Sequence, residues 1–406
     1  MSKKILNNIE IELPASKSIS NRVLIVNAIS NSFEPIENLS NSDDTKSIFN
    51  VLYSNTNTFD VGEGGAPIRF LTAYLSGIVG KWIIKGSERL NKRPIAPLVE
   101  ALNSIGAQIT YLEEEGYPPL QIMGSNIIEK EVKVPGNISS QFISALILIA
   151  PRLKDGLKII IEGECVSKSY INMTLSLIKD FGISYTFVNN EISIKPGAYK
   201  QISYSIESDW TAASYIYSIL AISDNRNIRI KLNGLKHIST QGDKHQVELW
   251  SKLGIKTAYT NKGVFISKEK DPVKSLKYNF SEMPDLVQTF VVACCQQGVQ
   301  FEFTGLSTLV NKETNRIEAL CNELKKLGFI LETNSTDSIS WKGEGQLVNK
   351  EISIETYNDH RMAMSFAPLL QMSEKISITN PKVVSKSFPN FWEEVEKLNI
   401  VNKNRN

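Results

Sequence analysis

Residues 284–329, PDLVQTFVVACCQQGVQFEFTGLSTLVNKETNRIEALCNELKKLGF, contain one copy of the pattern that decides the fold. The segment begins with an apolar helix expected over residues 284–295, and a strand expected over residues 300–305 follows it. A second helix is expected over residues 317–329, where apolar residues recur at helical spacing along one face. Gly328 suits a left-handed cap at the end of this helix. The segment therefore predicts a buried helix, a strand and a surface helix in succession.

The same succession recurs along the chain. Glycines close the surface helices at nearly constant intervals of 76, 72 and 74 residues, at Gly106, Gly182, Gly254 and Gly328. Apolar helices rich in small residues, which should be buried, are expected over 16–30, 64–77, 137–150, 208–221, 284–295 and 358–371. Surface helices are expected over 97–109, 171–183, 245–255 and 317–329. Runs rich in β-branched residues predict strands at 81–86, 157–163, 191–196, 227–234, 263–268, 300–305 and 351–356.

An α/β fold of two domains is the expected architecture. Each unit should read strand-helix-strand-helix-strand-strand, and about six units divide evenly into three for each domain, with the main crossover near residues 205–209. The first domain is expected over residues 14–205, and the second over residues 1–13 together with 206–406. Strands too often come in pairs without a helix between them, which excludes a Rossmann fold and a TIM barrel.

The composition is that of an ordinary globular protein. Of the 406 residues, 42% are hydrophobic and 22% are charged, which excludes collagen-like, low-complexity and disordered chains. The net charge of +2 argues against binding nucleic acid or a membrane surface through bulk positive charge. Residues 1–14 have no apolar core of a signal peptide, and no run reaches the roughly 18 apolar residues of a membrane span. A soluble, cytoplasmic protein is expected.

Neither a metal nor a nucleotide cofactor is expected. The four cysteines form no CxxC pair, so buried free thiols are expected at Cys165, Cys294, Cys295 and Cys321 rather than disulfides or a zinc site. The chain has only three histidines, and it has neither a GxxxxGK[ST] loop nor a GxGxxG loop.

Polar residues gather where the first apolar helix begins. In residues 16–22, SKSISNR, serines alternate with Lys17 and Arg22, and Ser18 shares a helix face with Arg22. A helix N-terminus exposes backbone N–H groups and the positive end of the helix dipole, so this segment predicts a phosphate site. Residues 139–141, SSQ, open another buried helix in the same way, although a Ser-Ser run can equally be a plain helix cap.

A second set of charges lies in the second half of the chain. In residues 311–320, NKETNRIEAL, Lys312 and Arg316 are four residues apart, which also suits a solvated helix face. In residues 358–364, NDHRMAM, three charged or polar residues directly precede an apolar helix, which is costly unless they face a site. Arg93 precedes a proline that starts a helix, so it could face an anion or simply lie on an exposed loop.

Positive charge near helix starts is what these candidates share; they are Lys17, Arg22, Arg93, Lys312, Arg316, Arg361 and Lys386. Few carboxylates accompany them, namely Asp285, Glu313 and Asp359. A phosphate monoester carries about −1.5 to −2 charge at neutral pH, so two such groups would account for this many cations. The sequence therefore predicts two anionic substrates, with one or two carboxylates left for proton transfer.

Six segments together resemble the EPSP synthase family (3-phosphoshikimate 1-carboxyvinyltransferase). They are LPASKSISNRVLI (13–25), GNISSQFISALILIAP (136–151), VSKSYINMTL (166–175), NKETNRIEAL (311–320), TYNDHRMAMSFA (356–367) and SKSFPNFWEEV (385–395). They run in order over nearly the whole chain. The resemblance implies two inside-out α/β barrel domains, each of three βαβαββ units, with a substrate cleft between them.

The resemblance also implies a reaction, in which the enolpyruvyl group of phosphoenolpyruvate is transferred to the 5-hydroxyl of shikimate 3-phosphate and phosphate is released. This is a step of the shikimate pathway of aromatic amino-acid biosynthesis, and glyphosate is the family's inhibitor. Glu313 matches the acid that protonates the methylene carbon, and either Asp285 or Lys17 would be the base. No cofactor or metal is implied, and a monomer is expected.

The remaining site residues are matched by position. Those implied to bind shikimate 3-phosphate are Lys17, Ser18, Arg22, Ser139, Ser140, Gln141, Ser167, Tyr170, Asp285 and Lys312. Those implied to bind phosphoenolpyruvate are Lys17, Gly65, Arg93, Gln141, Arg316, His360, Arg361 and Lys386. Two places depart from the family pattern: residues 62–66 read GEGGA where Gly-Asn-x-Gly-Thr is usual, and Thr308 and Val310 replace an asparagine and an arginine.

Two other functions remain compatible with parts of the sequence. The sister transferase that acts on UDP-N-acetylglucosamine uses a loop residue, usually cysteine, as its acid, and no cysteine of this chain lies in the corresponding loop. A non-catalytic repeat scaffold or an RNA-end-binding protein would carry dispersed surface charge, or stacking aromatics near basic residues. Phosphate release with each acceptor separates the two enzymes, and calorimetry with a phosphorylated small molecule tests the scaffold.

Overall fold

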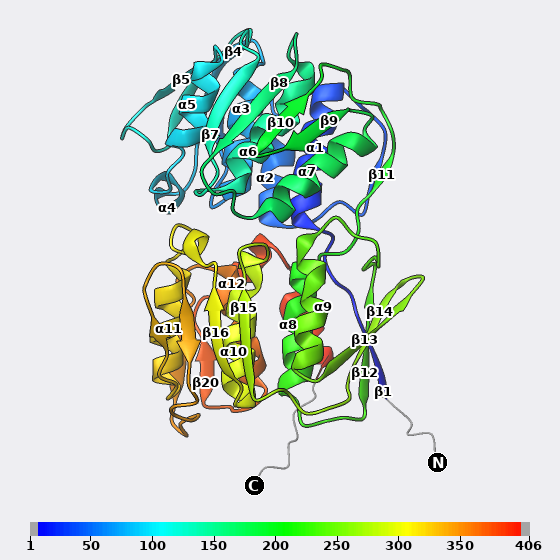
Figure 1. Ribbon diagram of the computed structural model, residues 1–406, viewed down its shortest axis with the longest axis vertical. Coiled ribbons are helices and arrows are strands. Elements are labelled where there is room, and N and C mark those ends of the chain that lie inside the picture. Colours follow the sequence, from blue (N-terminus) through cyan, green and yellow to red (C-terminus); the bar gives the residue numbers. More distant parts are fainter. Residues whose placement is uncertain (1–6, 399–406) are drawn as a thin grey trace. The chain divides into compact units, whose positions relative to one another are not determined.

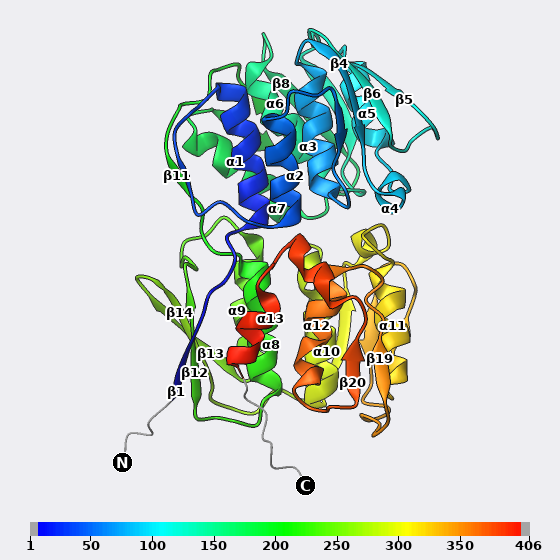
Figure 2. The ribbon, with the colours of Figure 1, turned by 180° about the vertical axis from the view of Figure 1, so that it is seen from behind.

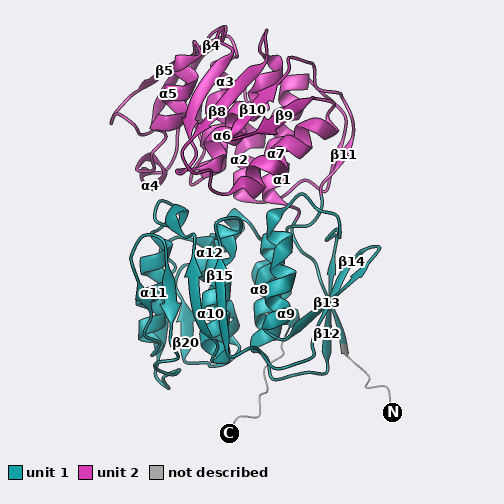
Figure 3. Cartoon of the chain, viewed as in Figure 1, with its two compact units in different colours: residues 1–14, 207–406 teal, residues 15–206 magenta. Residues whose placement is uncertain are grey.

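The computed structural model describes residues 7–398, so part of the N-terminal segment for which no signal peptide is expected lies outside the described residues. The chain divides into two compact units (Figure 3). Unit 2 is Ala15–Ile206, and unit 1 combines Met1–Pro14 with Glu207–Asn406. The chain therefore starts in unit 1, completes unit 2 and returns to unit 1.

Unit 2 is coloured blue to green in Figure 1. Its strands form three separate sheets, two of four strands and one of two. In both larger sheets the first pair of strands is parallel and the later pairs are antiparallel. Their orders are β3 (Thr58–Asp60), β4 (Gly80–Lys85), β6 (Leu120–Gly124), β5 (Gln108–Tyr111), and β7 (Glu131–Pro135), β8 (Leu157–Glu162), β10 (Glu191–Ile194), β9 (Tyr185–Val188). The third sheet pairs β2 (Ile36–Glu37) with β11 (Tyr204–Ser205).

The helices of unit 2 are α1 (Lys17–Ser30), α2 (Asp43–Leu52), α3 (Gly65–Ser76), α4 (Glu88–Asn91), α5 (Ala96–Ser104), α6 (Ser140–Ile149) and α7 (Lys168–Asp180), with a 3-10 turn at Ala150–Arg152. Helices α1, α3 and α6 are buried over most of their length and supply much of the core. Arg22 of α1 donates hydrogen bonds to Thr174 of α7 and Ser144 of α6. All three residues lie in the first two turns of their helices, so these helices begin at the same end of unit 2.

Most of unit 1 is coloured green to red in Figure 2. It repeats the arrangement, again with two four-stranded sheets and one two-stranded sheet. The four-stranded orders are β1 (Asn7–Ile11), β12 (Ile228–Asn233), β14 (Gly263–Lys268), β13 (Ile255–Thr260), and β15 (Ser275–Asn279), β16 (Gln300–Thr304), β18 (Ile339–Trp341), β17 (Glu332–Thr333). The two-stranded sheet pairs β19 (Ile352–Ile354) with β20 (Ile376–Ile378). The first strand of the unit, β1, comes from the N-terminal segment and pairs in parallel with β12.

The helices of unit 1 are α8 (Trp210–Ile222), α9 (Gln246–Lys252), α10 (Val287–Gln297), α11 (Arg316–Lys326), α12 (His360–Leu370) and α13 (Phe391–Lys397). Its 3-10 turns are Gly242–His245, Pro284–Leu286, Ser307–Leu309 and Pro381–Lys386. The Thr289 hydroxyl of α10 contacts those of Ser214 on α8 and Ser365 on α12. These hydroxyls lie near the starts of three buried helices, so the helices of this unit also share one N-terminal end.

The predicted α/β class is confirmed, and each predicted helix and strand is present. The helices expected over 97–109 and 245–255 end earlier, at Ser104 and Lys252, because the next strand begins at Gln108 and at Ile255. The four closing glycines, Gly106, Gly182, Gly254 and Gly328, have φ of 105°, 87°, 94° and 98°, in the positive region where a side chain is strained. Two further details differ from the expectation. Two of the six sheets have only two strands, and residues 284–286 form a 3-10 turn ahead of α10. Among the described residues, no sheet closes into a barrel.

Candidate active site

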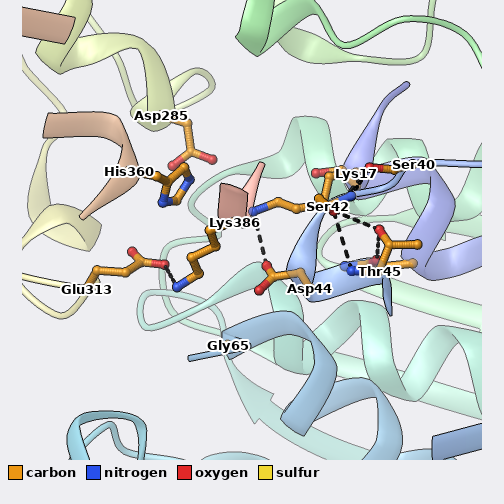
Figure 4. Close-up of polar contacts among 12 residues, drawn as sticks. Lys17, Ser40, Ser42, Asp44, Thr45, Gly65, Asp285, Glu313, His360 and Lys386 are labelled. Carbon is orange, nitrogen blue, oxygen red and sulfur yellow. Dashed lines mark hydrogen bonds and ion pairs between the residues drawn. The ribbon is translucent and has the colours of Figure 1, made fainter. Parts of the chain in front are cut away.

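Lys17 lies in the first turn of α1, and its ammonium group forms an ion pair with Asp44 of α2 at 3.0 Å (Figure 4). Helix α1 begins here because Ser16 accepts a hydrogen bond from the Ile19 N–H group. Both side chains of the ion pair are largely buried. The prediction did not include Asp44, although a serine followed by two aspartates at 42–44 is the sequence signature of a helix start.

Hydroxyl groups hold α2 against α1 around this ion pair. The Thr45 hydroxyl donates to the Asn21 side chain at 2.8 Å, and it also contacts the Ser42 hydroxyl at 3.0 Å (Figure 4). Ser20 accepts from the Ser40 N–H group at 3.1 Å. These contacts fix the position of Asp44, and hence of Lys17.

Arg22 points into unit 2 and is almost fully buried. Its guanidinium group donates to the Thr174 hydroxyl at 2.7 Å, the Ser18 carbonyl at 2.7 Å and the Ser144 hydroxyl at 3.1 Å. Burial lowers the pKa of Arg22 to about 10. The side chain therefore connects the N-terminal turns of α1, α6 and α7. Its contact with shikimate 3-phosphate stays a prediction.

Two further arginines lie at the start of α3, where Gly64 is the N-cap. Arg69 donates to the Gly65 carbonyl at 2.8 Å and to the Gln141 side chain at 3.0 Å. A Cβ atom on Gly65 would lie 2.7 Å from an Arg93 nitrogen and 2.9 Å from an Arg69 nitrogen, so glycine is needed for both guanidinium groups to approach. Arg69 was not among the predicted site residues, although an arginine inside an apolar helix was a visible signal.

The other predicted residues of unit 2 also lie at helix starts. Ser139 caps α6 by accepting from the Gln141 N–H group at 3.3 Å, and Ser140 is the first residue of that helix. Ser167 precedes α7 in the left-handed conformation, with φ of 54°. The Tyr170 carbonyl, in the first turn of α7, accepts from Thr174. Unit 2 thus gathers serines, Lys17 and three arginines at the N-terminal ends of its helices.

In unit 1, Arg316 is the centre of a buried cluster. Its side chain, 1% exposed, donates to Asp359 at 2.8 Å, to Glu313 at 2.9 Å and to Asp285 at 3.2 Å. Burial alone would lower the pKa of Arg316, but Asp359, Glu313 and Asp285 outweigh burial and raise it. The arginine is therefore always charged and holds three carboxylates together.

Arg361 and Lys386 complete the cluster. Arg361 donates to the second Asp285 oxygen at 2.8 Å and to the Tyr215 hydroxyl at 3.3 Å, while Lys386 pairs with Glu313 at 2.7 Å (Figure 4). Lys312 is farther from its carboxylate, 4.0 Å from Asp285. Tyr215 was not predicted, because an aromatic residue within an apolar helix gives no sign of a polar contact.

The start of α12 fixes two more members. Asp359 is the N-cap and accepts from the Arg361 N–H group at 2.9 Å, so its carboxylate serves both the helix and Arg316. The ring of His360 is buried, with Nδ1 3.6 Å from an Asp359 oxygen. The predicted residues of unit 1, namely Asp285, Lys312, Glu313, Arg316, His360, Arg361 and Lys386, thus lie in one cluster or next to it.

Asp243 lies close to this cluster and was missed. It is buried in a 3-10 turn, and the Thr211 hydroxyl donates to it. Burial, reinforced by the negative charge of Asp285, raises the pKa of Asp243 to about 7. Its sequence context, QGDKH, is a polar turn, which gave no sign of burial.

Within residues 7–398, no group of three or more His, Cys, Asp or Glu side chains is arranged to hold a metal ion. No helix in that range combines the length and the apolar character of a membrane span. The four cysteines are free thiols, and three of them are buried.

The fold and the two sets of cations at helix starts define an α/β enzyme for small anionic substrates. A family model described as EPSP synthase (3-phosphoshikimate 1-carboxyvinyltransferase) matches residues 53–395. The chain is 46% identical over 388 residues to 3-phosphoshikimate 1-carboxyvinyltransferase of Bacteroides fragilis (strain YCH46), with 95% of this chain and 94% of the relative covered. It is 34% identical to the enzyme of the same name from Sulfurovum sp. (strain NBC37-1), with 96% of each chain covered.

The fold agrees with these relatives. A solved EPSP synthase from Acinetobacter baumannii has a TM-score of 0.74 to this chain at 19% identity, and the match covers 99% of this chain and 98% of that one. The chain belongs to the EPSP synthase family. It is therefore a transferase by family.

Proposed function

We propose that this enzyme transfers the enolpyruvyl group of phosphoenolpyruvate to the 5-hydroxyl of shikimate 3-phosphate and releases phosphate. Family membership over nearly the whole chain supports the proposal. The observation that carries it is the buried cluster of unit 1, in which Arg316, Arg361 and Lys386 contact the carboxylates of Asp285 and Glu313. The cluster combines groups for binding anions with groups for moving protons.

The cations divide naturally between the two substrates. In unit 2, the helix starts around Lys17, Ser139 and Ser167 would bind shikimate 3-phosphate, since backbone N–H groups and serine hydroxyls are donors to phosphate. Arg316, Arg361 and Lys386 of unit 1, with Arg93 and Gly65 of unit 2, would bind the phosphate and carboxylate of phosphoenolpyruvate. Together, these cations would bind the two substrates of one reaction.

The reaction needs two proton transfers in its first step. Asp285 or Lys17 takes the proton of the 5-hydroxyl, whose oxygen attacks the enol carbon, while Glu313 gives a proton to the methylene carbon. The tetrahedral adduct then loses phosphate as a proton leaves the new methyl group, which restores the double bond. No metal or cofactor takes part in any of these steps, and a monomer is sufficient.

Glu313 can act as the acid only if it binds a proton. Both of its oxygens accept from cations, Arg316 at 2.9 Å and Lys386 at 2.7 Å, and contacts of this kind favour the ionised form of a carboxylate. A bound phosphoenolpyruvate would draw both cations to its own oxygens, because a phosphate carries about two negative charges. The carboxylate, now without that support, would take up a proton and become the acid.

Phosphate release decides the proposal. Purified enzyme should release phosphate from phosphoenolpyruvate only when shikimate 3-phosphate is present. Mass spectrometry should find shikimate 3-phosphate heavier by one enolpyruvyl group, with its own phosphate retained. UDP-N-acetylglucosamine in place of shikimate 3-phosphate is the matched control. Release with the nucleotide sugar, or with neither acceptor, would overturn the proposal.

A further inference from the structure

A second contact joins the helix of Arg316 to the turn that presents Arg361. Glu323 lies seven residues after Arg316, so the two side chains project from the same face of α11. Arg316 binds Asp359, while Glu323 accepts a hydrogen bond from the Tyr357 hydroxyl at 2.7 Å. Helix α11 is therefore tied to this turn at two levels, two helical turns apart.

Glu323 is a charge buried away from the proposed chemistry. Its side chain is 0% exposed. Besides Tyr357, it accepts from Lys326 at 2.6 Å and from the Glu355 N–H group at 3.0 Å, so both oxygens are used. Burying a carboxylate is costly unless it is fully paired, and an apolar side chain would fill the same place more cheaply. The energetic cost of burying this carboxylate is explained if Glu323 fixes the conformation of the turn that contains Tyr357.

The turn itself needs holding, because its backbone is strained. Tyr357 and Asn358 have φ of 53° each, in the left-handed region that residues with a Cβ atom avoid. The Asn380 side chain donates to the Asn358 side chain at 2.7 Å, which supports the turn from its other side. Immediately afterwards comes Asp359, whose carboxylate binds both the Arg316 side chain and the Arg361 N–H group.

We propose that Glu323 and Tyr357 are positioning residues that fix Arg316 and Arg361 relative to each other. Without the Tyr357 hydroxyl, the turn relaxes towards right-handed backbone and carries Asp359 with it. Asp285 still bonds both guanidinium groups, but the two arginines lose the second carboxylate that fixes their relative position, and they match a bound anion less well. The inference rests on the proposed function in taking that anion to be phosphoenolpyruvate.

The variant Tyr357→Phe tests the proposal, since it removes one oxygen and keeps the ring. It should raise the KM for phosphoenolpyruvate about tenfold, because the displaced arginines bond the anion less well. The KM for shikimate 3-phosphate should change less. The matched control is Tyr217→Phe, which removes a hydroxyl that contacts Thr257 at 2.8 Å in the same unit and should leave both constants unchanged.

A purely structural role would lower the melting temperature of Tyr357→Phe and leave both KM values as they were, which would overturn the proposal. Asn380→Ala loosens the same turn from the other side and should raise the KM for phosphoenolpyruvate too, so it replaces Tyr357→Phe if that variant does not fold.

Hydrogen exchange supplies a readout that needs no activity. Peptides that span residues 355–361 should exchange faster in Tyr357→Phe than in the parent, and at the parental rate in Tyr217→Phe. Equal exchange in all three proteins would also overturn the proposal. If the parent protein releases no phosphate, the proposed function is wrong. The hydrogen-exchange rates of residues 355–361 would still show whether the Tyr357 hydroxyl stabilises the turn.

Discussion

Replacing Glu313 by glutamine removes one negative charge from the unit 1 cluster and keeps the size and shape of the side chain. Arg316 keeps its bonds to Asp359 and Asp285, so it stays paired. Lys386, 2.7 Å from Glu313, exchanges a carboxylate for an amide. Weakening the two charged bonds of Glu313, to Lys386 and to Arg316, without removing them lowers the free energy of unfolding by about 1–3 kcal/mol. That loss is small enough for the variant to fold.

The effect on turnover should be much larger. A positioned acid contributes about 10²–10⁴ in rate, which corresponds to roughly 3–5 kcal/mol in the activation free energy. Glutamine keeps the size of the side chain and cannot give a proton, so kcat should fall by that factor. The KM for phosphoenolpyruvate should change less, because Arg316, Arg361 and Lys386 all remain.

Continuous measurement of phosphate release, with both substrates saturating, gives kcat. The matched control is Glu394→Gln, since Glu394 is another buried glutamate of unit 1, paired with Lys397 and bonded to the Glu12 N–H group. The control should lose some stability and keep its turnover. A parental kcat for Glu313→Gln would refute the reasoning and leave Glu313 as an ion-pair residue.

Three further predictions follow from single contacts. The pKa of Asp243 is raised to about 7, so this carboxyl takes up a proton on folding. The stabilising effect of that proton is lost as pH rises from about 4 to 7. Asp243→Asn should therefore raise the melting temperature at pH 8 by more than at pH 5, and equal shifts would contradict this. Gly65→Ala places a methyl group within 2.9 Å of two guanidinium nitrogens. It should therefore raise the KM for phosphoenolpyruvate more than the KM for shikimate 3-phosphate. Unchanged KM values would show that the two guanidinium groups can move aside without losing the substrate. Asp44→Asn removes the partner charge of Lys17 and should lower the free energy of unfolding by about 1–3 kcal/mol. Shikimate 3-phosphate should raise the melting temperature of this variant by more than that of the parent, and an equal rise would show that Lys17 does not bind the phosphate.

Regular elements could be predicted because each carries its own signal. The glycine at the end of each surface helix has positive φ, and only that residue type reaches this conformation cheaply. Helix α2 was missed, although its buried residues Thr45, Ile48 and Val51 recur at helical spacing. The two-residue strands β2 and β11 were not predicted either, since strands this short carry little periodicity. Their positions depend on pairing between distant segments, as in the sheet that joins β2 to β11.

Charged residues of the candidate site could be predicted for a different reason, because a cation ahead of an apolar helix is conspicuous. Their partners could not. Asp44, which pairs with Lys17, and Tyr215, which contacts Arg361, come from separate helices, and the sequence does not say which helices meet. The sequence also does not show in which direction a side chain points. Arg22 was predicted to contact the substrate, whereas its guanidinium group is hydrogen-bonded inside unit 2.

The return of the chain to unit 1 has a consequence for biosynthesis. Strand β1 pairs with β12, and the register joins Asn7 to Ile228, so the N-terminal strand has no partner until more than half of the protein has been made. At the usual rates of elongation of about 5–20 residues per second, that wait lasts roughly 10–40 seconds. Residues 15–206, in contrast, are complete before β12 exists, and they can fold while the ribosome is still working. During the wait β1, in which Ile9 and Ile11 alternate with polar residues, is a strand with open edges, and such edges pair readily with the wrong chain. A nascent chain of this protein should therefore depend on chaperones that bind short extended segments close to its N-terminus.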